Sequence, residues 1–339
     1  MSASTVGHDD YALRRVPEEA RYHWFPVALQ RFGQLSSLAS FLLGATLGFG
    51  LDFKDAVLAI TFGAVLLEIV TIFTGIAGQR EGLSTSVLAR WTGFGTAGSS
   101  LIGLAIGISA IGWFGIQSAV SAQGLASLVG VLPVWGWALV FGLLVTVIVT
   151  YGFGSMAWTA YITVLAFLVL AGWSIISELS AHSLSGLLGA APAGPALTLL
   201  QGTTIVAGGF IVGAVITPDM SRFNRSPWDV VKQTVIGVTL GEYVIGLIGV
   251  LLALALKSND VIAIVTSTSG FLGSLVIIAA TLKINDWNLY AASLGVVNFV
   301  DRVFARRLNR AQVTLVLGLA GSPARCSPPP ASSTRSPTS

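Results

Sequence analysis

Apolar runs of about 20 residues recur along most of this 339-residue chain, and they constrain its fold more than any other feature. A run of this length can cross the hydrocarbon core of a bilayer as a single helix. Only 10% of the residues are charged, whereas roughly 25% are charged in an average soluble protein. The sequence therefore predicts an all-α polytopic membrane protein. It excludes a soluble enzyme, a disulfide scaffold and a nucleic-acid-binding protein.

Short polar loops separate eight predicted spans. The spans cover residues 26–50, 56–79, 98–128, 134–152, 155–177, 197–216, 233–256 and 262–282, and the last continues as a helix to about residue 298. With the N-terminus placed in the cytoplasm, the outside loops carry only Lys54 and Lys257, and the inside loops carry the other loop Lys and Arg residues. Such an excess marks the cytoplasmic side. We therefore expect a plasma-membrane protein with a cytoplasmic N-terminus.

The chain divides into four predicted segments. They are a cytoplasmic N-terminal segment (1–23), a transmembrane domain (24–300), a basic loop with the start of an incomplete ninth span (301–321), and a Pro/Ser-rich tail of disordered composition (322–339). Two interpretations of the end are open: a natural cytoplasmic tail, or a span cut short by a shifted reading frame or a premature end. The break falls inside an apolar run, which favours the second.

Charged residues inside the predicted spans are functional candidates, because a charge in the bilayer core costs several kcal/mol. Lys283 and Asp286 are three residues apart and share one face of the eighth helix. The alternative is that they pair only to hold helices together. Arg31 lies near the cytoplasmic end of the first span, and we expect its side chain to snorkel to the interface.

Two glycine-containing stretches predict interrupted helices. Gly33 lies among polar residues of the first span, and Gly208 and Gly209 lie in the middle of the sixth. Interrupted helices five spans apart are typical of transporters built from two inverted repeats, in which opened backbone lines a substrate site at mid-membrane. No metal-ligand spacing and no catalytic triad is visible in the sequence. We therefore expect no enzymatic activity, no metal and no cofactor.

Three motifs resemble those of one family. They are Gly112-Trp-Phe-Gly-Ile-Gln117, then Gly209-Phe210 with Thr217-Pro-Asp219-Met-Ser-Arg222-Phe-Asn-Arg225, and then Asn285-Asp-Trp-Asn288-Leu-Tyr290-Ala-Ala-Ser-Leu-Gly295. In this order they resemble the nucleobase–cation symporter family 1, which includes cytosine, purine, allantoin and hydantoin permeases. The spelling of the motifs is most similar to the cytosine permeases. The resemblance covers about residues 25–300. It implies a LeuT-type five-plus-five inverted-repeat fold, here with an incomplete second repeat.

The resemblance also implies a substrate site made of aromatic rings, amides and glycines. The expected residues are Trp113, Phe210, Gln117, Asn285, Gly208 and Gly209. Two rings can sandwich a planar base, and stacking is worth about 1–3 kcal/mol per base. An amide can donate to and accept from the base edge, and the glycine backbone can add contacts. The alternative for each ring is core or lipid packing, and for each amide it is an interhelical hydrogen bond.

The identity of the coupling ion is inferred from positions at which this sequence differs from the family pattern. Sodium-coupled members hold the ion between carbonyls of the first span and hydroxyls of the eighth. Gly33 fits the first part, whereas Lys283 and Ile284 stand at the hydroxyl positions. An ammonium group there would occupy the place of the cation. We therefore expect a coupled proton rather than sodium, with Lys283 as a surrogate cation or titrating group and Asp286 as its partner.

Together these observations predict a secondary active transporter that imports a nucleobase or related heterocycle by alternating access. The expected partners are this small molecule and the lipid bilayer, with no nucleic acid and no obligate protein partner. Two alternatives stay open: a truncated, non-transporting membrane protein, and an amino-acid carrier of the same fold. Trp113 together with Gln117 favours a flat heterocycle over an amino acid.

Overall fold

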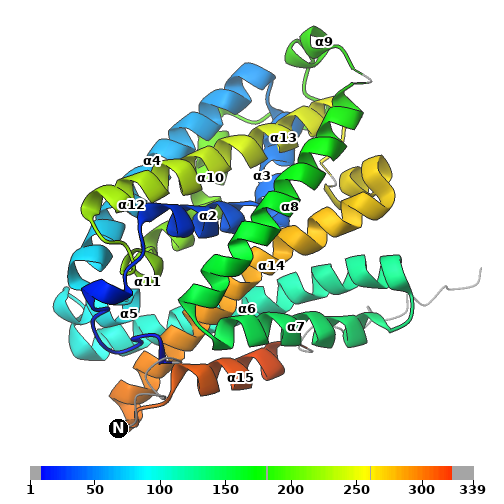
Figure 1. The fold of residues 1–339 in the computed structure, drawn as a ribbon. Helices are drawn as coiled ribbons and strands as arrows, with labels where there is room; N and C mark the ends of the chain where they lie inside the picture. The colour runs from blue at the N-terminus through cyan, green and yellow to red at the C-terminus, as the bar shows by residue number, and fades with distance from the viewer. Residues whose placement is uncertain (1–8, 181, 260, 323–339) are drawn as a thin grey trace, which may run out of the picture.

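The computed structural model describes residues 9–180, 182–259 and 261–322, which form a bundle of helices (Figure 1). The longer helices are α2 (Trp24–Leu35), α3 (Leu38–Gly50), α4 (Phe53–Glu81), α6 (Gly95–Val129), α7 (Val134–Thr150), α8 (Phe153–Leu179), α10 (Leu199–Val215), α13 (Leu240–Leu256), α14 (Val261–Phe304) and α15 (Arg310–Gly321). Shorter elements connect them: η2 (Glu18–Ala20), α5 (Thr85–Leu88), η3 (Ala89–Trp91), α9 (Leu184–Leu188), α11 (Pro218–Ser221), α12 (Pro227–Gln233) and the π-helix η4 (Thr234–Thr239).

The described helices coincide with the predicted spans to within a few residues at most ends. Local capping sets the bounds, as α4 illustrates. The Asp52 carboxylate accepts a hydrogen bond from Asp55 N at 2.8 Å at the start of α4. Gly82 ends the helix in the left-handed conformation, with a φ of 63°. The predicted tail, residues 322–339, lies outside the described residues apart from Ser322.

Three helical stretches of the described chain are long and apolar enough to cross a membrane: Phe53–Glu81, Gly95–Ala126 and Pro227–Leu256. The pair Trp24–Leu35 and Ala39–Gly50 meets the same criterion as one span bent by 56°. Further apolar helices of up to 17 residues are present, a length near the lower end of what a bilayer requires. These helices are those of a multi-pass membrane protein, and the number of eight spans stays a prediction.

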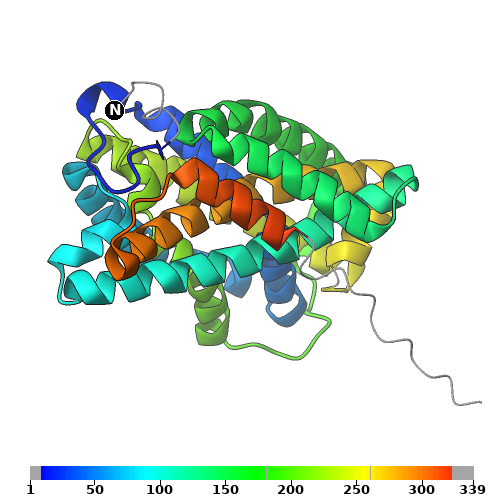
Figure 2. The same ribbon diagram turned by 90° about the horizontal axis from the view of Figure 1, so that it is seen from below.

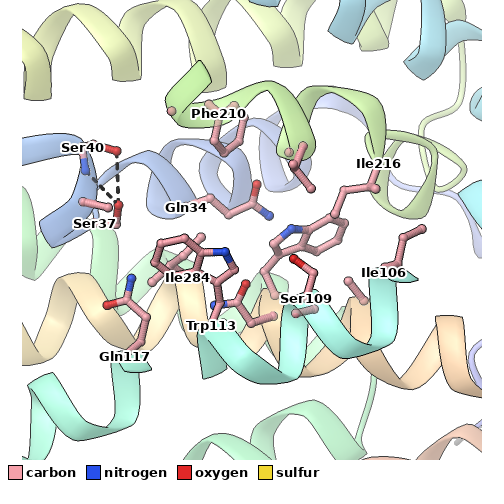
Figure 3. Close-up of a pocket in the computed structure, with 18 of the residues that line it drawn as sticks. Gln34, Ser37, Ser40, Ile106, Ser109, Trp113, Gln117, Phe210, Ile216 and Ile284 are labelled. Atoms are coloured by element: carbon pink, nitrogen blue, oxygen red, sulfur yellow. Dashed lines mark hydrogen bonds between the residues drawn. The ribbon is translucent and has the colours of Figure 1, made fainter. Parts of the chain in front are cut away.

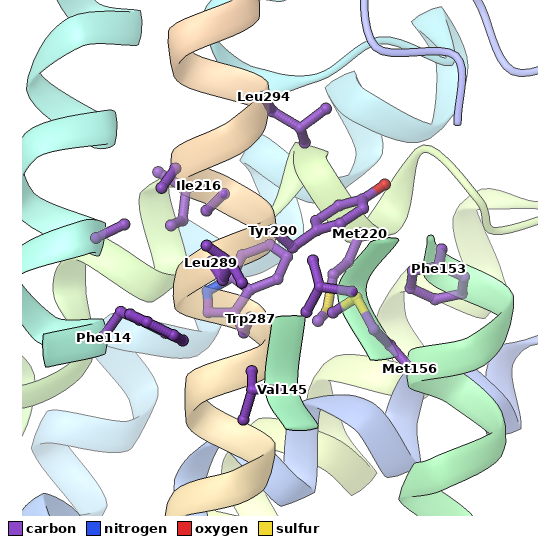
Figure 4. Close-up of a cluster of buried hydrophobic side chains, with 14 of the residues drawn as sticks. Phe114, Val145, Phe153, Met156, Ile216, Met220, Trp287, Leu289, Tyr290 and Leu294 are labelled. Carbon is purple, nitrogen blue, oxygen red and sulfur yellow. The ribbon is translucent and has the colours of Figure 1, made fainter. Parts of the chain in front are cut away.

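Helix α14 runs diagonally through the bundle and organises the other helices around it (Figure 1). Helices α6, α7 and α15 lie on one side of α14, and α4, α10 and α13 lie on the other. Seen from below, α15 lies against α7 (Figure 2). A buried apolar cluster fills the space where α14 meets α6, α7 and α8, and it includes Phe114, Val145, Met156, Trp287 and Tyr290 (Figure 4).

The first span is interrupted between α2 and α3, where Ser36 and Ser37 separate the two helices. Ser36 Oγ donates to Phe32 O at 3.0 Å, and Ser37 Oγ accepts from Ser40 N at 3.3 Å. Phe32 O also accepts from Ser36 N at 3.0 Å, so the Ser37 hydroxyl is the group that supplies a missing partner, at the start of α3. The expected interruption of the first span is therefore confirmed. Gly33 itself is still helical, within α2.

The interruption expected at Gly208 and Gly209 is wrong. Helix α10 continues through both residues and ends at Val215, and the break lies between Val215 and Pro218, where α11 begins. A glycine in a helix interior costs only about 1 kcal/mol relative to alanine, so helix packing readily overrides it. Proline lacks the N–H that would continue the helix.

The N-terminal segment is fastened to one end of the bundle by Asp10. Its carboxylate accepts hydrogen bonds from Phe153 N at 2.9 Å and from Tyr290 Oη at 2.6 Å. Arg222 is fully buried and donates to Tyr290 Oη at 2.7 Å and to the carbonyl oxygens of Asp10 and Tyr11. The network joins the start of the described chain to α8, α14 and the end of α11.

Helices α3 and α13 pack with their backbones in close approach. A Cβ atom on Gly249 would lie 2.6 Å from Phe41 O and 2.8 Å from Ala45 N, which no side chain can accommodate without moving the helices. Gly44 and Gly48 lie on the facing side of this contact, against the backbone of Gly246 and Val250. Small residues that let helices approach in this way are typical of membrane bundles.

We predict that Gly249→Ala destabilises the protein by about 1–3 kcal/mol, because the added methyl group overpacks the contact. Gly172→Ala on α8 is the matched control, since a Cβ atom there meets nothing within 4 Å. Alanine is the better helix former, so the control should be neutral or slightly stabilising. Thermal unfolding of the detergent-solubilised variants measures both. Equal melting temperatures for the two variants would contradict the close contact.

Candidate functional site

A cavity of about 200 Å³ lies where the interrupted first span meets α6, α10 and α14 (Figure 3). Its lining comes from four parts of the chain that are distant in sequence. The lining residues are Gln34, Ser37, Ala39, Ser40, Leu43, Ile106, Ser109, Ala110, Trp113, Gln117, Gly208, Gly209, Phe210, Val212, Gly213, Ile216, Ile284, Trp287, Asn288 and Ala291. The break between α2 and α3 thus forms one wall of the cavity.

Aromatic rings from different helices line this cavity. Figure 3 shows Trp113 reaching in from α6 and Phe210 from α10 on the other side of the same space. Trp287 of α14 adds a third ring. Aromatic walls of this kind suit a flat, aromatic ligand, because every ring face can stack.

Apart from the indole N–H groups of Trp113 and Trp287, the polar side-chain groups of the cavity are amides and hydroxyls. They belong to Gln34, Ser37, Ser40, Ser109, Gln117 and Asn288. None of the lining residues, all of them within the described chain, is charged. Such a cavity can form hydrogen bonds with the edge of a neutral ligand, and it offers no counter-charge to an ionised one.

Asn285, expected at the edge of the substrate, does not line the cavity in this structure. Its amide donates to Phe114 O at 3.1 Å and to Ser118 Oγ at 2.9 Å, both on α6. Asn288, about one turn later, lines the cavity and donates to Asn285 Oδ1 at 3.4 Å. The motif contains both asparagines, and sequence spacing alone could not separate the residue that joins helices from the residue that faces the cavity.

Both expected glycines of the sixth span, Gly208 and Gly209, line the cavity. A Cβ atom on Gly208 would meet nothing within 4 Å, whereas one on Gly209 would collide with Leu43. Because α10 is continuous here, their backbone groups belong to a regular helix. The two glycines therefore contribute space rather than opened backbone.

Lys283 and Asp286 form a buried ion pair on α14, with side-chain exposures of 1% and 0%. Lys283 Nζ donates to the Asp286 carboxylate, to Met156 O at 2.9 Å and to Thr159 Oγ1 at 3.1 Å. Asp286 Oδ1 accepts from Gln30 Nε2 at 3.0 Å. The pair and its partners therefore join α14 to α2 and α8.

Gly33 provides the room for the lysine side chain. A Cβ atom on Gly33 would lie 3.1 Å from Cβ and Cγ of Lys283 and 2.9 Å from Val164 Cγ2. The stem of Lys283 thus passes directly against α2, one turn before the break at Ser36. The three residues expected to act in coupling, Gly33, Lys283 and Asp286, are brought together at this junction.

The expectation that Arg31 snorkels to the interface is wrong, because its side chain is fully buried. Its guanidinium donates to Gln34 Oε1 at 3.1 Å, to Thr217 Oγ1 at 3.0 Å and to Gly213 O at 3.4 Å. The carbonyl of Gly213 lies in the last turn of α10, where the helix dipole is negative. This acceptor set holds Arg31 inside the bundle.

Sequence reasoning missed several residues of the cavity wall. They are Gln34, Ser37, Ser40, Ser109, Trp287 and Asn288. Two signals could have found most of them: the run of polar residues that follows Gly33 in an otherwise apolar span, and the second asparagine of the eighth-span motif. Ser109 carries no such signal, because a single serine in a transmembrane helix is common.

A cavity beside an interrupted span, within a bundle of apolar helices, is typical of membrane transporters of the inverted-repeat class. The solved structure of the nucleobase-cation-symport-1 family transporter Mhp1, in a closed conformation with bromovinylhydantoin bound, has this fold. It superposes with a TM-score of 0.81 at 19% identity, over 92% of this chain and 73% of that one. The expected LeuT-type fold is confirmed.

Sequence comparison gives the family. Residues 15–326 match the permeases for cytosine/purines, uracil, thiamine and allantoin. The cytosine permease of Escherichia coli K12 is 32% identical over 292 residues, which cover 86% of this chain and 69% of that protein. The hydantoin permease of Microbacterium maritypicum is 24% identical, over 91% of this chain and 67% of that protein. The chain belongs to this permease family, as the motifs indicated, and its relatives are transporters rather than enzymes.

We predict that Asp286→Ala destabilises the protein by about 3–5 kcal/mol, because it leaves the ammonium of Lys283 buried without its counter-charge. The double variant Lys283→Met, Asp286→Leu should regain most of this loss, since both charges are then removed. Arg15→Ala is the control, because it breaks an ion pair whose side chains are 62% and 44% exposed. That change should cost at most about 1 kcal/mol. Thermal unfolding in detergent compares the three, and a double variant no more stable than Asp286→Ala would contradict the pairing energetics.

Proposed function

We propose that this chain is a secondary active transporter that imports a neutral, planar heterocycle of the nucleobase class, coupled to protons. The observation that carries the proposal is the uncharged cavity flanked by Trp113 and Phe210, with amides and hydroxyls at its edges. A nucleobase has two flat faces and a rim of donors and acceptors. Trp113 and Phe210 stack on the faces, and Gln117, Asn288 and Gln34 read the rim.

The uncharged lining argues against the amino-acid carrier. A zwitterionic amino acid needs a counter-charge, or an opened helix end, for its ammonium and its carboxylate. Arg31 is held behind the wall by Gln34 and Thr217, and Lys283 is held by Asp286. Neither cation lines the cavity. The names of the relatives, a cytosine permease and a hydantoin permease, support the same class of substrate.

Lys283 and Asp286 are proposed as the coupling group. The ammonium of Lys283 already has three oxygen acceptors, from Met156, Thr159 and Asp286, as a bound cation would. A proton taken up by Asp286 neutralises its carboxylate and leaves the ammonium without its counter-charge. The packing of α14 against α2 and α8 then depends on the proton. Other buried ionisable side chains on helices that contact α14 are Arg31 on α2, directed toward α10, Glu242 on α13 and Arg310 on α15.

Alternating access follows from this arrangement. The substrate enters the cavity from outside, the two helix bundles rock about it, and the substrate and the proton leave inside. No covalent step is involved. The break between α2 and α3 lies against both the cavity and the contacts of Lys283. A rearrangement of the Lys283 contacts would therefore alter the cavity wall, and a ligand in the cavity would alter the Lys283 contacts.

Trp113→Ala should weaken binding of cytosine, adenine, uracil or allantoin, whichever the protein binds, by about 5–150-fold, because one stacking face is worth about 1–3 kcal/mol. Trp158→Ala is the matched control, since Trp158 is 65% exposed on α8 and does not line the cavity. Ligand-dependent stabilisation of the purified variants reports the affinity. Equal affinities in the two variants would remove Trp113 from the site.

Uptake of labelled cytosine, adenine, uracil and allantoin by cells expressing the chain tests the function. We expect one of these to accumulate, faster at lower external pH, and to lose accumulation with a proton uncoupler. Replacing sodium by potassium should have no effect. Lys283→Thr removes the ammonium and restores a hydroxyl, so it should abolish the dependence on the uncoupler.

The other outcomes separate the alternatives. Uptake that requires sodium, or that is unchanged in Lys283→Thr, would overturn proton coupling and leave the substrate class standing. Binding without uptake, with the protein present in the membrane, would indicate a non-transporting protein. Preference for amino acids over all four heterocycles would overturn the substrate class.

A further inference from the structure

Arg31 is a buried cation behind the cavity wall that the coupling scheme does not use. Its guanidinium contacts Gln34 Oε1 at 3.1 Å and Thr217 Oγ1 at 3.0 Å, and its carbon Cζ lies 5.2 Å from the centre of the Phe210 ring. Within the described residues it forms no ion pair. Gln34 and Phe210 both line the cavity. Arg31 therefore holds two residues of the candidate site from behind.

The chemistry of the guanidinium fixes how the Gln34 amide is turned. A guanidinium has donors and no acceptor, so the amide atom that faces Arg31 has to be the oxygen. The amide nitrogen then points away from Arg31, and one of its two N–H groups donates to Met220 Sδ at 3.2 Å. The second N–H has no partner in the described part of the chain. Figure 3 shows the Gln34 side chain extending from α2 into the space between Phe210 and Trp113.

Gln117 differs from Gln34 in this respect. It lines the cavity from α6, and its side chain makes no hydrogen bond within the described residues. A free amide can turn so that either its oxygen or its nitrogen faces a ligand. The serine hydroxyls of the cavity can likewise donate or accept. On the wall formed by α2, by contrast, a buried cation holds the Gln34 amide in one hydrogen-bonding sense.

We propose that Arg31 is a positioning residue that locks Gln34 as a hydrogen-bond donor, and that this donor selects heterocycles carrying a carbonyl oxygen on the edge that faces α2. The inference rests on the proposed function and adds the chemical rule by which the site chooses among planar heterocycles. A ligand that lacks the carbonyl leaves a buried N–H unpaired, which disfavours its binding.

Matched ligand pairs test the rule. The probes are cytosine with the aminopyrimidine that lacks its carbonyl, and hypoxanthine with purine. Ligand-induced stabilisation of the purified full chain gives an apparent Kd for each. In the wild type, the member with the carbonyl should bind at least roughly tenfold more tightly in the pair that fits the cavity. The readout is the preference ratio, which is the apparent Kd of the member without the carbonyl divided by that of the member with it.

Three variants alter the contact through which Arg31 orients the Gln34 amide. Gln34→Glu keeps an acceptor for Arg31 but removes the donor, so the preference ratio should fall to about one. Arg31→Met frees the amide to turn and should also lower the ratio. Arg31→Lys keeps a donor-only cation beside Gln34 Oε1 and should restore most of the ratio, which a purely structural role of Arg31 would not explain.

Arg310→Met is the matched control. Arg310 is also fully buried, donates to the carbonyl oxygens of Val149 and Thr150 at the end of α7, and lies 5.2 Å from the Tyr290 ring. It contacts no residue of the cavity wall in these interactions. Its loss should lower the melting temperature and leave the preference ratio unchanged.

Each remaining outcome decides the question. An unchanged ratio in Gln34→Glu, or an equal fall in Arg310→Met, would overturn the positioning role. A wild type that binds the heterocycles without preferring the carbonyl would overturn the selection rule and leave the proposed function standing. A wild type that binds none of the four probes, and that also accumulates none of cytosine, adenine, uracil and allantoin, would overturn the proposed function and this inference with it.

Discussion

A helix can be broken inside a membrane only if the chain itself satisfies the backbone groups that the break exposes, and the site of this protein depends on that constraint. Between α2 and α3, Phe32 O accepts from both the N–H and the hydroxyl of Ser36, and Ser37 Oγ accepts from Ser40 N at the start of α3. The same short stretch places Gln34, Ser37 and Ser40 in the cavity wall. The polar surface offered to a ligand is thus created where the regular helix stops.

Two buried cations stand beside the interrupted span and connect it to different neighbours. Arg31 joins α2 to the end of α10 and has no carboxylate partner in the described chain, whereas Lys283 joins α14 to α8 and is paired with Asp286. Each has a backbone carbonyl and a threonine hydroxyl among its acceptors. Both charges are therefore kept behind the wall, and the cavity itself stays neutral while cations shape its surroundings.

The helices could be predicted from the sequence because span length and hydrophobicity are local properties. The segment 98–128, for example, became α6 at Gly95–Val129. The cavity was predicted in part: Trp113, Gln117 and Phe210 line it, whereas Asn285 does not and Asn288 does. The burial of Arg31 and the continuity of α10 through Gly208 could not be predicted, because both depend on which acceptors and helices lie opposite once the chain is folded.

The π-helix η4 and α13 follow one another without a gap, and they touch opposite sides of the break in the first span. Gly237 of η4 packs against Ala28 and Arg31 of α2, and Gly249 of α13 packs against Phe41 of α3. These two elements therefore bridge the break between α2 and α3. The relative placement of α2 and α3 is thus tied to this one pair of elements, in which the π-helical turn at Thr234–Thr239 makes the contact to α2.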